Sequence, residues 1–269
     1  MHSARQQIKL SNLLHFFWAF GIILKKASRS RRKTTKGNGM EQLKFKRYEL
    51  KYLVTEEQYS ALLKLLDEYA EGDIYGKTTI CNVYYDTPSF LLIRRSIEKP
   101  VYKEKLRVRC YGVPHQNSRV FVELKKKFKS VVFKRRVKLT LDEAEALLTK
   151  KQCAKPSQVT DEILYFLDFY KDLQPAVCIF CQREAFYGKD DADLRITFDS
   201  NILFRDYDLR LTDGIYGEAI LPEGYRLLEV KTAKAVPLWL SEFFTKEKIY
   251  KTSFSKYGTA YLKIAQRRK

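Results

Sequence analysis

The chain has few histidines and no apolar run long enough to cross a membrane. His2, His15 and His115 are its three histidines, and none lies in a charged motif. We therefore do not expect a histidine-based site. The apolar stretch 13–24 is interrupted by His15. It is too short for a transmembrane helix, which needs about 20 residues.

The chain also lacks the two CxxC motifs that a four-cysteine zinc site requires. The five cysteines are an odd number, and Cys81, Cys110 and Cys178 lie in apolar, strand-like runs, where a thiol behaves as a small hydrophobe. Cys178 and Cys181 have CxxC spacing, but residues three apart on a strand face opposite ways, and there is no second CxxC to complete a zinc site. This usage predicts a reducing, cytoplasmic location.

Acidic residues are absent from the first 39 positions, which contain nine Lys and Arg. We interpret residues 1–39 as a basic N-terminal extension, disordered or not native, that precedes a true start at Met40. A peripheral anchor at the inner face of the membrane is the alternative. The remaining 42 Lys and Arg exceed 32 Asp and Glu, so residues 40–269 keep a net charge of +10. That excess predicts a phosphate-bearing partner.

Residues 40–269 contain ample material for one folded domain. The chain is 45% hydrophobic and has 18 tyrosines and 17 phenylalanines. There is no repeat or long linker after Met40, and the pattern predicts an α+β fold with an antiparallel sheet and peripheral helices. Strands are expected at 44–54, 78–86, 102–111, 118–127, 130–140, 176–187, 194–199 and 225–231. Helices are expected from the Thr55–Gln58 capping box to about 71, and at 89–97, 141–148, 160–170, 238–245 and 257–265.

Several of these strands alternate charged with apolar residues. Since side chains alternate between the faces of a strand, Arg107 and Arg109 share one face, and Glu123 and Lys125 share another. The pattern recurs at 49–51, 195–199 and 229–231. One such strand would normally have a solvated face. In many strands, with helices available to cover the apolar positions, it predicts a closed or nearly closed barrel with charge inside. Its outward positions would include Leu106, Val108 and Cys110.

The order and spacing of these motifs resemble the VTC (vacuolar transporter chaperone, or polyphosphate polymerase) domain family, within the CYTH-like triphosphate tunnel superfamily. The bacterial stand-alone members are the most similar type. The resemblance runs from Arg47-Tyr48-Glu49-Leu50-Lys51-Tyr52 to Thr252-Ser253-Phe254-Ser255-Lys256-Tyr257-Gly258. Between them lie Tyr84-Tyr85-Asp86-Thr87, Lys134-Arg135-Arg136, Arg183-Glu184-Ala185-Phe186, and the alternating strands.

The resemblance implies an eight-stranded antiparallel barrel, a triphosphate tunnel, in which the ATP γ-phosphate is transferred to a growing polyphosphate chain. It assigns catalytic roles to Lys51, Arg107, Arg109, Lys134, Arg183, Arg195 and Lys256. It assigns phosphate binding to Lys125, Lys231 and Ser255, and binding of Mn²⁺ or Mg²⁺ to Glu229. Such roles are chemically reasonable, because phosphoryl transfer depends mainly on positioning and charge neutralisation. A membrane-protein partner is a further implication of the eukaryotic relatives.

One departure bears on the reaction. CYTH hydrolases have an ExExK signature, whereas this chain has Arg47 in place of the first carboxylate, before Glu49 and Lys51. Fewer carboxylates argue against efficient triphosphate hydrolysis. A metal-dependent tripolyphosphatase or nucleoside triphosphatase is still an alternative, as is a non-catalytic binder of polyphosphate or nucleic acid. We favour ATP and polyphosphate over nucleic acid as partners. For Glu49, Glu123 and Asp199 two roles stay open: salt bridges to neighbours inside the barrel, or orientation of the basic residues that bind phosphate.

Overall fold

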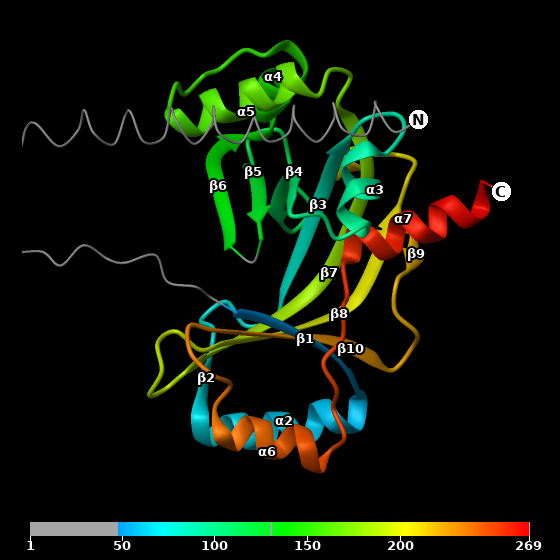
Figure 1. Cartoon of the computed structure of the whole chain (residues 1–269). Coiled ribbons are helices and arrows are strands. Elements are labelled where there is room, and N and C mark those ends of the chain that lie inside the picture. The colour runs from blue at the N-terminus through cyan, green and yellow to red at the C-terminus, as the bar shows by residue number, and fades with distance from the viewer. Residues whose placement is uncertain (1–47, 130, 269) are drawn as a thin grey trace, which may run out of the picture. The chain divides into compact units, whose positions relative to one another are not determined.

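An antiparallel sheet organises the computed structural model, which describes residues 48–129 and 131–268 (Figure 1). Residues 1–39, the predicted N-terminal extension, lie outside the described residues, so the boundary at Met40 stays a prediction. Among the helices that the structure describes, none combines the length and apolar character needed to cross a membrane.

All eight predicted strands are present and follow one path through the sheet. The path runs β1 (Tyr48–Thr55), β10 (Tyr225–Thr232), β8 (Arg195–Arg205), β7 (Gln174–Gly188), β3 (Thr78–Asp86), β4 (Tyr102–Tyr111), β5 (Arg119–Phe128) and β6 (Val131–Thr140). Every pairing along it is antiparallel. The short strands β2 (Ala70–Gly72) and β9 (Glu218–Ala219) pair with β7 and β8 and were not predicted.

Complete closure of the barrel, one form of the prediction, is wrong for the described residues. Their strand pairing ends at β1 on one side and β6 on the other. The free edge of β1 instead meets the segment before the last helix. Tyr52 forms a bridge with Lys251, and the Thr252 N–H donates to the Lys51 carbonyl at 2.7 Å. The sheet nevertheless curves. This curvature brings Glu49 Oε2 of β1 within 3.9 Å of Lys125 Nζ of β5.

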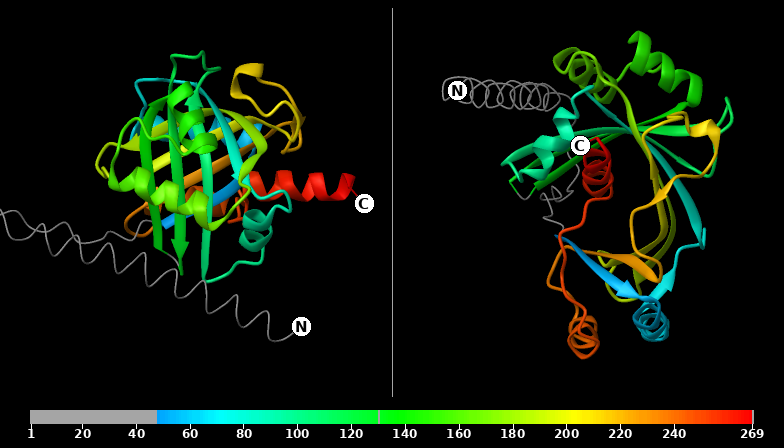
Figure 2. Two further views of the ribbon diagram at one scale, coloured as in Figure 1. Left: turned by 90° about the horizontal axis from the view of Figure 1, so that it is seen from above. Right: turned by 90° about the vertical axis from the view of Figure 1, so that its right-hand side faces the viewer.

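Two helix pairs cover the outer face of the curved sheet (Figures 1 and 2). One pair, α2 (Glu56–Tyr69) and α6 (Leu238–Lys246), packs on β1, β10 and β8. The other, α4 (Leu141–Lys150) and α5 (Gln158–Phe169), packs on β3, β4 and β5. Each pair supplies an apolar face that shields the sheet from water.

Capping residues determine where these helices begin. The Thr55 hydroxyl accepts the N–H of Gln58 at 3.3 Å, and the Gln58 side chain accepts the N–H of Thr55 at 3.0 Å. This reciprocal pair is the predicted capping box, and it satisfies donors that the first helical turn leaves free. Thr140 and Glu143 form the same arrangement at the start of α4.

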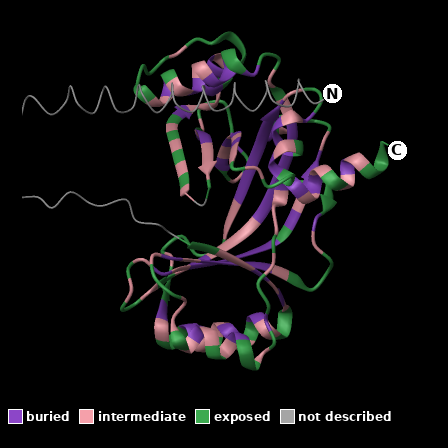
Figure 3. Ribbon diagram, in the orientation of Figure 1, coloured by how far each residue is buried: buried purple, intermediate pink, exposed green. Residues whose placement is uncertain are grey.

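The outward positions of β4 are apolar and buried, as predicted. Leu106, Val108 and Cys110 are at most 3% exposed and pack with Ile163 and Phe166 of α5 in one cluster (Figure 3). Their neighbours on the strand therefore point to the concave face.

The cysteines follow the same alternation. Cys178 packs in the cluster beneath α4 and α5, whereas Cys181 packs in a separate cluster on the concave side. All five cysteines are free thiols. The predicted opposite orientation of the CxxC pair is confirmed.

Two of the predicted helices, α3 (Leu91–Ile97) and α7 (Lys256–Arg267), lie on the concave side of the sheet, a position that the sequence did not predict. A one-turn helix, η1 (Leu211–Asp213), follows β8. Tyr257, Ala260 and Ile264 of α7 pack with Val177 and Ile179 of β7. These strand residues lie at alternate positions of β7 in line with Arg183, so all of them share one face of the strand. The concave face is therefore apolar under α7 and charged beside it.

Truncating the outer core should destabilise the protein strongly. Leu106→Ala removes a side chain with no exposure, so we expect a loss of about 2–5 kcal/mol in the free energy of unfolding. Chemical denaturation would measure it. Leu238→Ala, at a position that is 72% exposed, is the matched control and should change stability by less than about 0.5 kcal/mol. Equal effects of the two variants would contradict the packing described.

Candidate functional site

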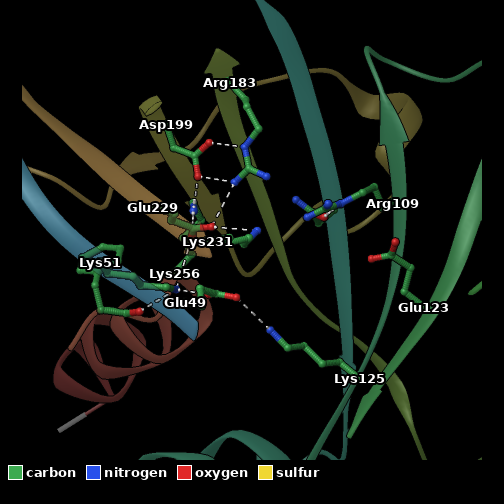
Figure 4. Close-up of polar contacts among 12 residues, drawn as sticks. Glu49, Lys51, Arg109, Glu123, Lys125, Arg183, Asp199, Glu229, Lys231 and Lys256 are labelled. Atoms are coloured by element: carbon green, nitrogen blue, oxygen red, sulfur yellow. Dashed lines mark hydrogen bonds and ion pairs between the residues drawn. The ribbon is translucent and has the colours of Figure 1, made fainter. Parts of the chain in front are cut away.

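Basic and acidic side chains from several strands and one helix meet on the concave face (Figure 4). The carboxylates are Glu49, Glu123, Asp199 and Glu229, from β1, β5, β8 and β10. The basic side chains at or beside this face include Lys51, Lys103, Lys105, Arg107, Arg109, Lys125, Lys127, Lys134, Arg183, Arg195, Lys231 and Lys256. Cations therefore outnumber carboxylates on this face, which suits a polyanion.

Asp199 holds two of these cations. It is fully buried, and both of its oxygens accept hydrogen bonds of 2.6 Å from Arg183, which lies opposite it on β7. Lys256, at the start of α7, also donates to Asp199. Burial by itself would raise the pKa of Asp199, but the two cations lower it below its usual value. Asp199 is therefore a fixed anion that orients Arg183 and Lys256.

Glu229 lies on β10, the strand next to β8, and four cations surround it. Its Oε1 is 3.4 Å from both Lys51 and Lys256, and its Oε2 is 3.6 Å from Lys231 and 3.8 Å from Arg183. Burial opposes ionisation, yet these cations hold the pKa of Glu229 well below its usual range. Three separate strands and one helix thus place their charges around a single carboxylate.

Glu123 is the corresponding anion on the other side of the curved sheet. Its Oε2 accepts from Arg107 Nε at 2.8 Å and Nη2 at 2.7 Å, and its Oε1 is 2.6 Å from Lys134. The third arm of the Arg107 guanidinium donates to the Tyr84 hydroxyl at 2.9 Å. Although burial opposes it, Arg107 and Arg109 lower the pKa of Glu123 to about 2. Arg107 is therefore held rigidly.

Two predicted arginines lack a carboxylate contact of this kind. Arg109 donates from Nε to the Asn82 side chain at 2.8 Å, and nearby Arg107 lowers its pKa in addition to burial. Arg195 stacks over Tyr187 at 5.1 Å, and its buried Nε finds no hydrogen-bond acceptor among the described residues. A buried donor without an acceptor costs free energy, so an anionic ligand would stabilise Arg195.

Lysines form a row across three neighbouring strands. Lys105 of β4 lies opposite Lys125 of β5, which lies opposite Lys134 of β6, and Lys103 lies opposite Lys127. Like charges directly opposite each other destabilise a sheet. Such a row is thus unfavourable for folding alone and is typical of an anion-binding surface.

A cavity of about 580 Å³ opens beside this row. Its walls come from β1, β4, β5 and β6, from α3 and α7, and from the segment 251–255 along β1. It is lined by seven lysines and a single carboxylate, Glu49. The lysines are Lys51, Lys99, Lys103, Lys105, Lys125, Lys127 and Lys251. We refer to it below as the lysine cavity.

Crowding lowers the proton affinity of the innermost lysines. Burial, with the like charges of Lys103, Lys125 and Lys51, lowers the pKa of Lys105 to about 8, even though Tyr84 opposes the shift. The Lys105 ammonium donates to the Ser255 hydroxyl at 3.2 Å. The pKa of Lys103 is lowered by burial and by Lys127, Lys125 and Lys99. An anion in the cavity would relieve this repulsion.

The predicted site residues come together on this one face. Lys51, Arg183, Lys231 and Lys256 surround Glu229, while Ser255 caps α7 and contacts Lys105. The Arg107 and Lys134 side chains share Glu123, and Lys125 reaches toward Glu49. The functional assignments themselves stay predictions.

Sequence reasoning missed several neighbours. Lys103 and Lys105 precede Arg107 at two-residue spacing, so the same alternation, extended two steps back along β4, would have found them. No local signal indicates that Tyr84 and Asn82 of β3 hold Arg107 and Arg109, because these contacts depend on strand pairing.

A metal ion would need ligands from outside the protein. Within the described ranges, no group of three or more His, Cys, Asp and Glu side chains is arranged to hold one. Glu229, the predicted ligand, is engaged by four cations. Its carboxylate is a hard oxygen donor of the kind that Mg²⁺ and Mn²⁺ prefer. The fit is that of a single protein ligand for a metal that arrives with substrate phosphates.

Comparisons with known proteins agree with this architecture. A candidate adenylyl cyclase from Hippeastrum, described as having a dominant triphosphatase activity, has 14% sequence identity, a TM-score of 0.50, and coverage of 78% of this chain and 92% of its own. A candidate adenylate cyclase from Bacillus halodurans has 15% identity and a TM-score of 0.48, with coverage of 78% and 95%. The Hippeastrum likeness supports the α+β fold described above.

Sequence comparison is informative at the level of the family. No curated protein matches the chain. The family model described as the VTC domain matches residues 46–265, which confirms the resemblance drawn from the motifs. Since this match covers most of the chain, the chain is a member of the VTC domain family.

Proposed function

We propose that this protein is a polyphosphate polymerase that transfers the γ-phosphate of ATP to the end of a polyphosphate chain on its concave face. The terminal oxygen of the chain forms the new bond to the γ-phosphorus, the bond from that phosphorus to the β-phosphate oxygen breaks, and ADP leaves. The attacking oxygen is already anionic, so no general base is required. In the part of the chain that the structure describes, the one histidine is His115, which lies in a turn.

The basic residues would supply charge neutralisation. Arg107, Arg109 and Arg183 offer planar, permanently charged donors that match phosphate oxygens, and Lys256 adds a point charge between β8 and β10. Asp199 and Glu123 hold these groups in place before substrate arrives. Such preorganisation lowers the cost of reorganising the site as charge shifts during transfer.

The lysine cavity is the observation that carries the choice of a long chain as substrate. A triphosphate needs only the cations around Glu229 and Glu123. The row of Lys105, Lys125 and Lys134 continues beyond them into a cavity with seven lysines and one carboxylate. Lysine is a flexible donor that adapts to a mobile chain better than the arginine fork does. An extended cationic path favours a polymer over a short nucleotide.

Glu229 would hold Mn²⁺ or Mg²⁺ together with substrate phosphates, and the ion would neutralise charge on the transferring group.

Hydrolysis of a triphosphate on the same face is the second candidate. The dominant triphosphatase activity described for the Hippeastrum protein, a neighbour in fold, motivates that candidate. The two reactions differ in product, which is a phosphate chain in one case and orthophosphate in the other. A cytoplasmic location, where ATP is available, accords with the five free thiols.

The reaction can be tested with the full chain, ATP and Mn²⁺ or Mg²⁺. We expect chains that are resolved by gel electrophoresis, with ADP formed in step. Arg109→Ala should reduce the rate by about 10²–10³, as for loss of a transition-state donor. Arg267→Ala, which removes an arginine half-exposed near the end of α7, should keep the rate. Orthophosphate as the sole product would replace the polymerase with the hydrolase, and a folded protein with neither product would exclude both.

The lysine cavity should matter for chains and not for triphosphate. The double variant Lys103→Ala/Lys127→Ala should bind long polyphosphate about tenfold more weakly while its tripolyphosphate affinity stays within about twofold. Calorimetry would measure both ligands. Lys64→Ala/Lys246→Ala removes the same charge from the exposed faces of α2 and α6 and is the control. If both cavity and control variants lose equal affinity, the effect is only that of net charge.

Chain binding should weaken above about pH 8. The cavity binds anions best when Lys105 is protonated, and its lowered pKa of about 8 means that the charge is lost as the pH rises through that value. Lys105→Arg keeps the charge at high pH and should flatten the decline between about pH 7 and 9. Affinity for long polyphosphate, measured across this range for both proteins, checks the expectation. Parallel declines would remove Lys105 as the cause.

A further inference from the structure

Asp86 connects two helices beneath the phosphate site without contacting the concave charges. It ends β3 and is completely buried. Its Oδ1 accepts the N–H groups of Thr87 and Leu92 at 2.8 Å, and its Oδ2 accepts the N–H of Ile93 at 3.0 Å. The residue that begins α3, Phe90, makes no side-chain cap. Asp86 therefore provides the cap that α3 lacks.

A fourth hydrogen bond to Asp86 comes from α7. The Tyr257 hydroxyl donates to Oδ2 at 2.8 Å, and this side chain is only 2% exposed. Tyr257 directly follows Lys256, the cation that bonds Asp199 and lies 3.4 Å from Glu229. A single buried carboxylate thus fixes the first turn of α7, from which the Lys256 side chain reaches the site.

The Tyr257 ring also reaches the opposite wall of the site. It stacks on Tyr84 with centroids 4.6 Å apart and planes 23° from parallel. The Tyr84 hydroxyl accepts a hydrogen bond of 2.9 Å from Arg107. The stacked pair therefore lies between Lys256 on one side and Arg107 on the other.

Close packing makes this connection stiff. A methyl group added at Gly258 would lie 3.2 Å from Ser255 Cβ and 3.8 Å from Ile97 of α3, so the start of α7 has little room to shift. Protein interiors at this density transmit displacement instead of absorbing it.

We propose that Asp86 and Tyr257 are positioning residues that fix Lys256 and Arg107 relative to each other for phosphate binding. Neither residue touches the ligand. The inference rests on the proposed phosphate site on the concave face, and it adds residues that act through the two cations. Lysine loses much rotamer freedom when it is ordered, so a helix start that is fixed in advance lowers the cost of binding.

Tyr257→Phe tests the proposal, because it removes the hydroxyl and keeps the ring stacked on Tyr84. With the full chain and tripolyphosphate, calorimetry should show about tenfold weaker binding. In a Lys256→Ala background the same change should cost less than about twofold, since the residue being positioned is gone. A role confined to stability would not produce this dependence on Lys256.

Tyr170→Phe is the matched control. Its hydroxyl donates to the buried carboxylate of Glu104 at 2.8 Å, the same chemistry on the outer side of β4. It should lower the melting temperature as Tyr257→Phe does and leave tripolyphosphate affinity unchanged.

A second arm of the experiment uses Tyr84→Phe. This change should weaken tripolyphosphate binding when Arg107 is present and not in an Arg107→Ala background.

The outcomes separate this inference from the proposed function. Wild-type protein that fails to bind tripolyphosphate would remove the phosphate site and the positioning role together. Wild-type binding with no effect of Tyr257→Phe, or with equal losses in the presence and absence of Lys256, would overturn the positioning role alone. For the second arm, equal losses of affinity from Tyr84→Phe in the presence and absence of Arg107 would likewise overturn the positioning role of Tyr84.

Discussion

Repulsion among buried cations is the constraint on which the rest of this structure depends. Many basic side chains share the concave face, and several lie directly opposite one another across strands. Asp199, Glu229 and Glu123 each hold at least two of them, and each is kept ionised by those same partners. Four carboxylates are too few to balance the charge. The face is thus stable enough to fold and still has an unmet demand for anions.

That balance divides the concave face into two regions with different chemistry. Around Asp199 and Glu123, the guanidinium groups of Arg183 and Arg107 are bonded at 2.6–2.9 Å and cannot reorient freely. In the lysine cavity, flexible ammonium groups face one another with a single carboxylate among them. The first region is suited to holding a reacting phosphate in one geometry. The second is suited to a chain that must move.

The helices contribute more than a cover for the sheet. Two pairs shield the outer face, which leaves the charged positions of the strands on the concave side. The third pair, α3 and α7, occupies part of that concave side and delivers Lys256 and Ser255 to the site. Because Asp86 joins these two helices to β3, the position of Lys256 is tied to the core of the fold and not to a loop.

How far the sequence reached can be judged from particular elements. Period-two alternation located the charged strands and the outward faces of Leu106 and Val108, because strand geometry allows no other arrangement. The same rule could have added Lys105. It could not find β2, since three residues hold too little pattern. Closure was also beyond it, because the edge of β1 is covered by residues near 251, about 200 positions away in the chain.

The sequence by itself therefore determined the family, the alternation of charge and the set of cations, all of which depend on local spacing. Only the tertiary structure decided which carboxylate holds which cation, that α7 lies on the concave face, and that Asp86 lies beneath Lys256 through Tyr257. The Lys256–Asp199 and Tyr257–Asp86 contacts join residues 57 and 171 positions apart. They follow from strand order and helix packing, which no short stretch of sequence specifies.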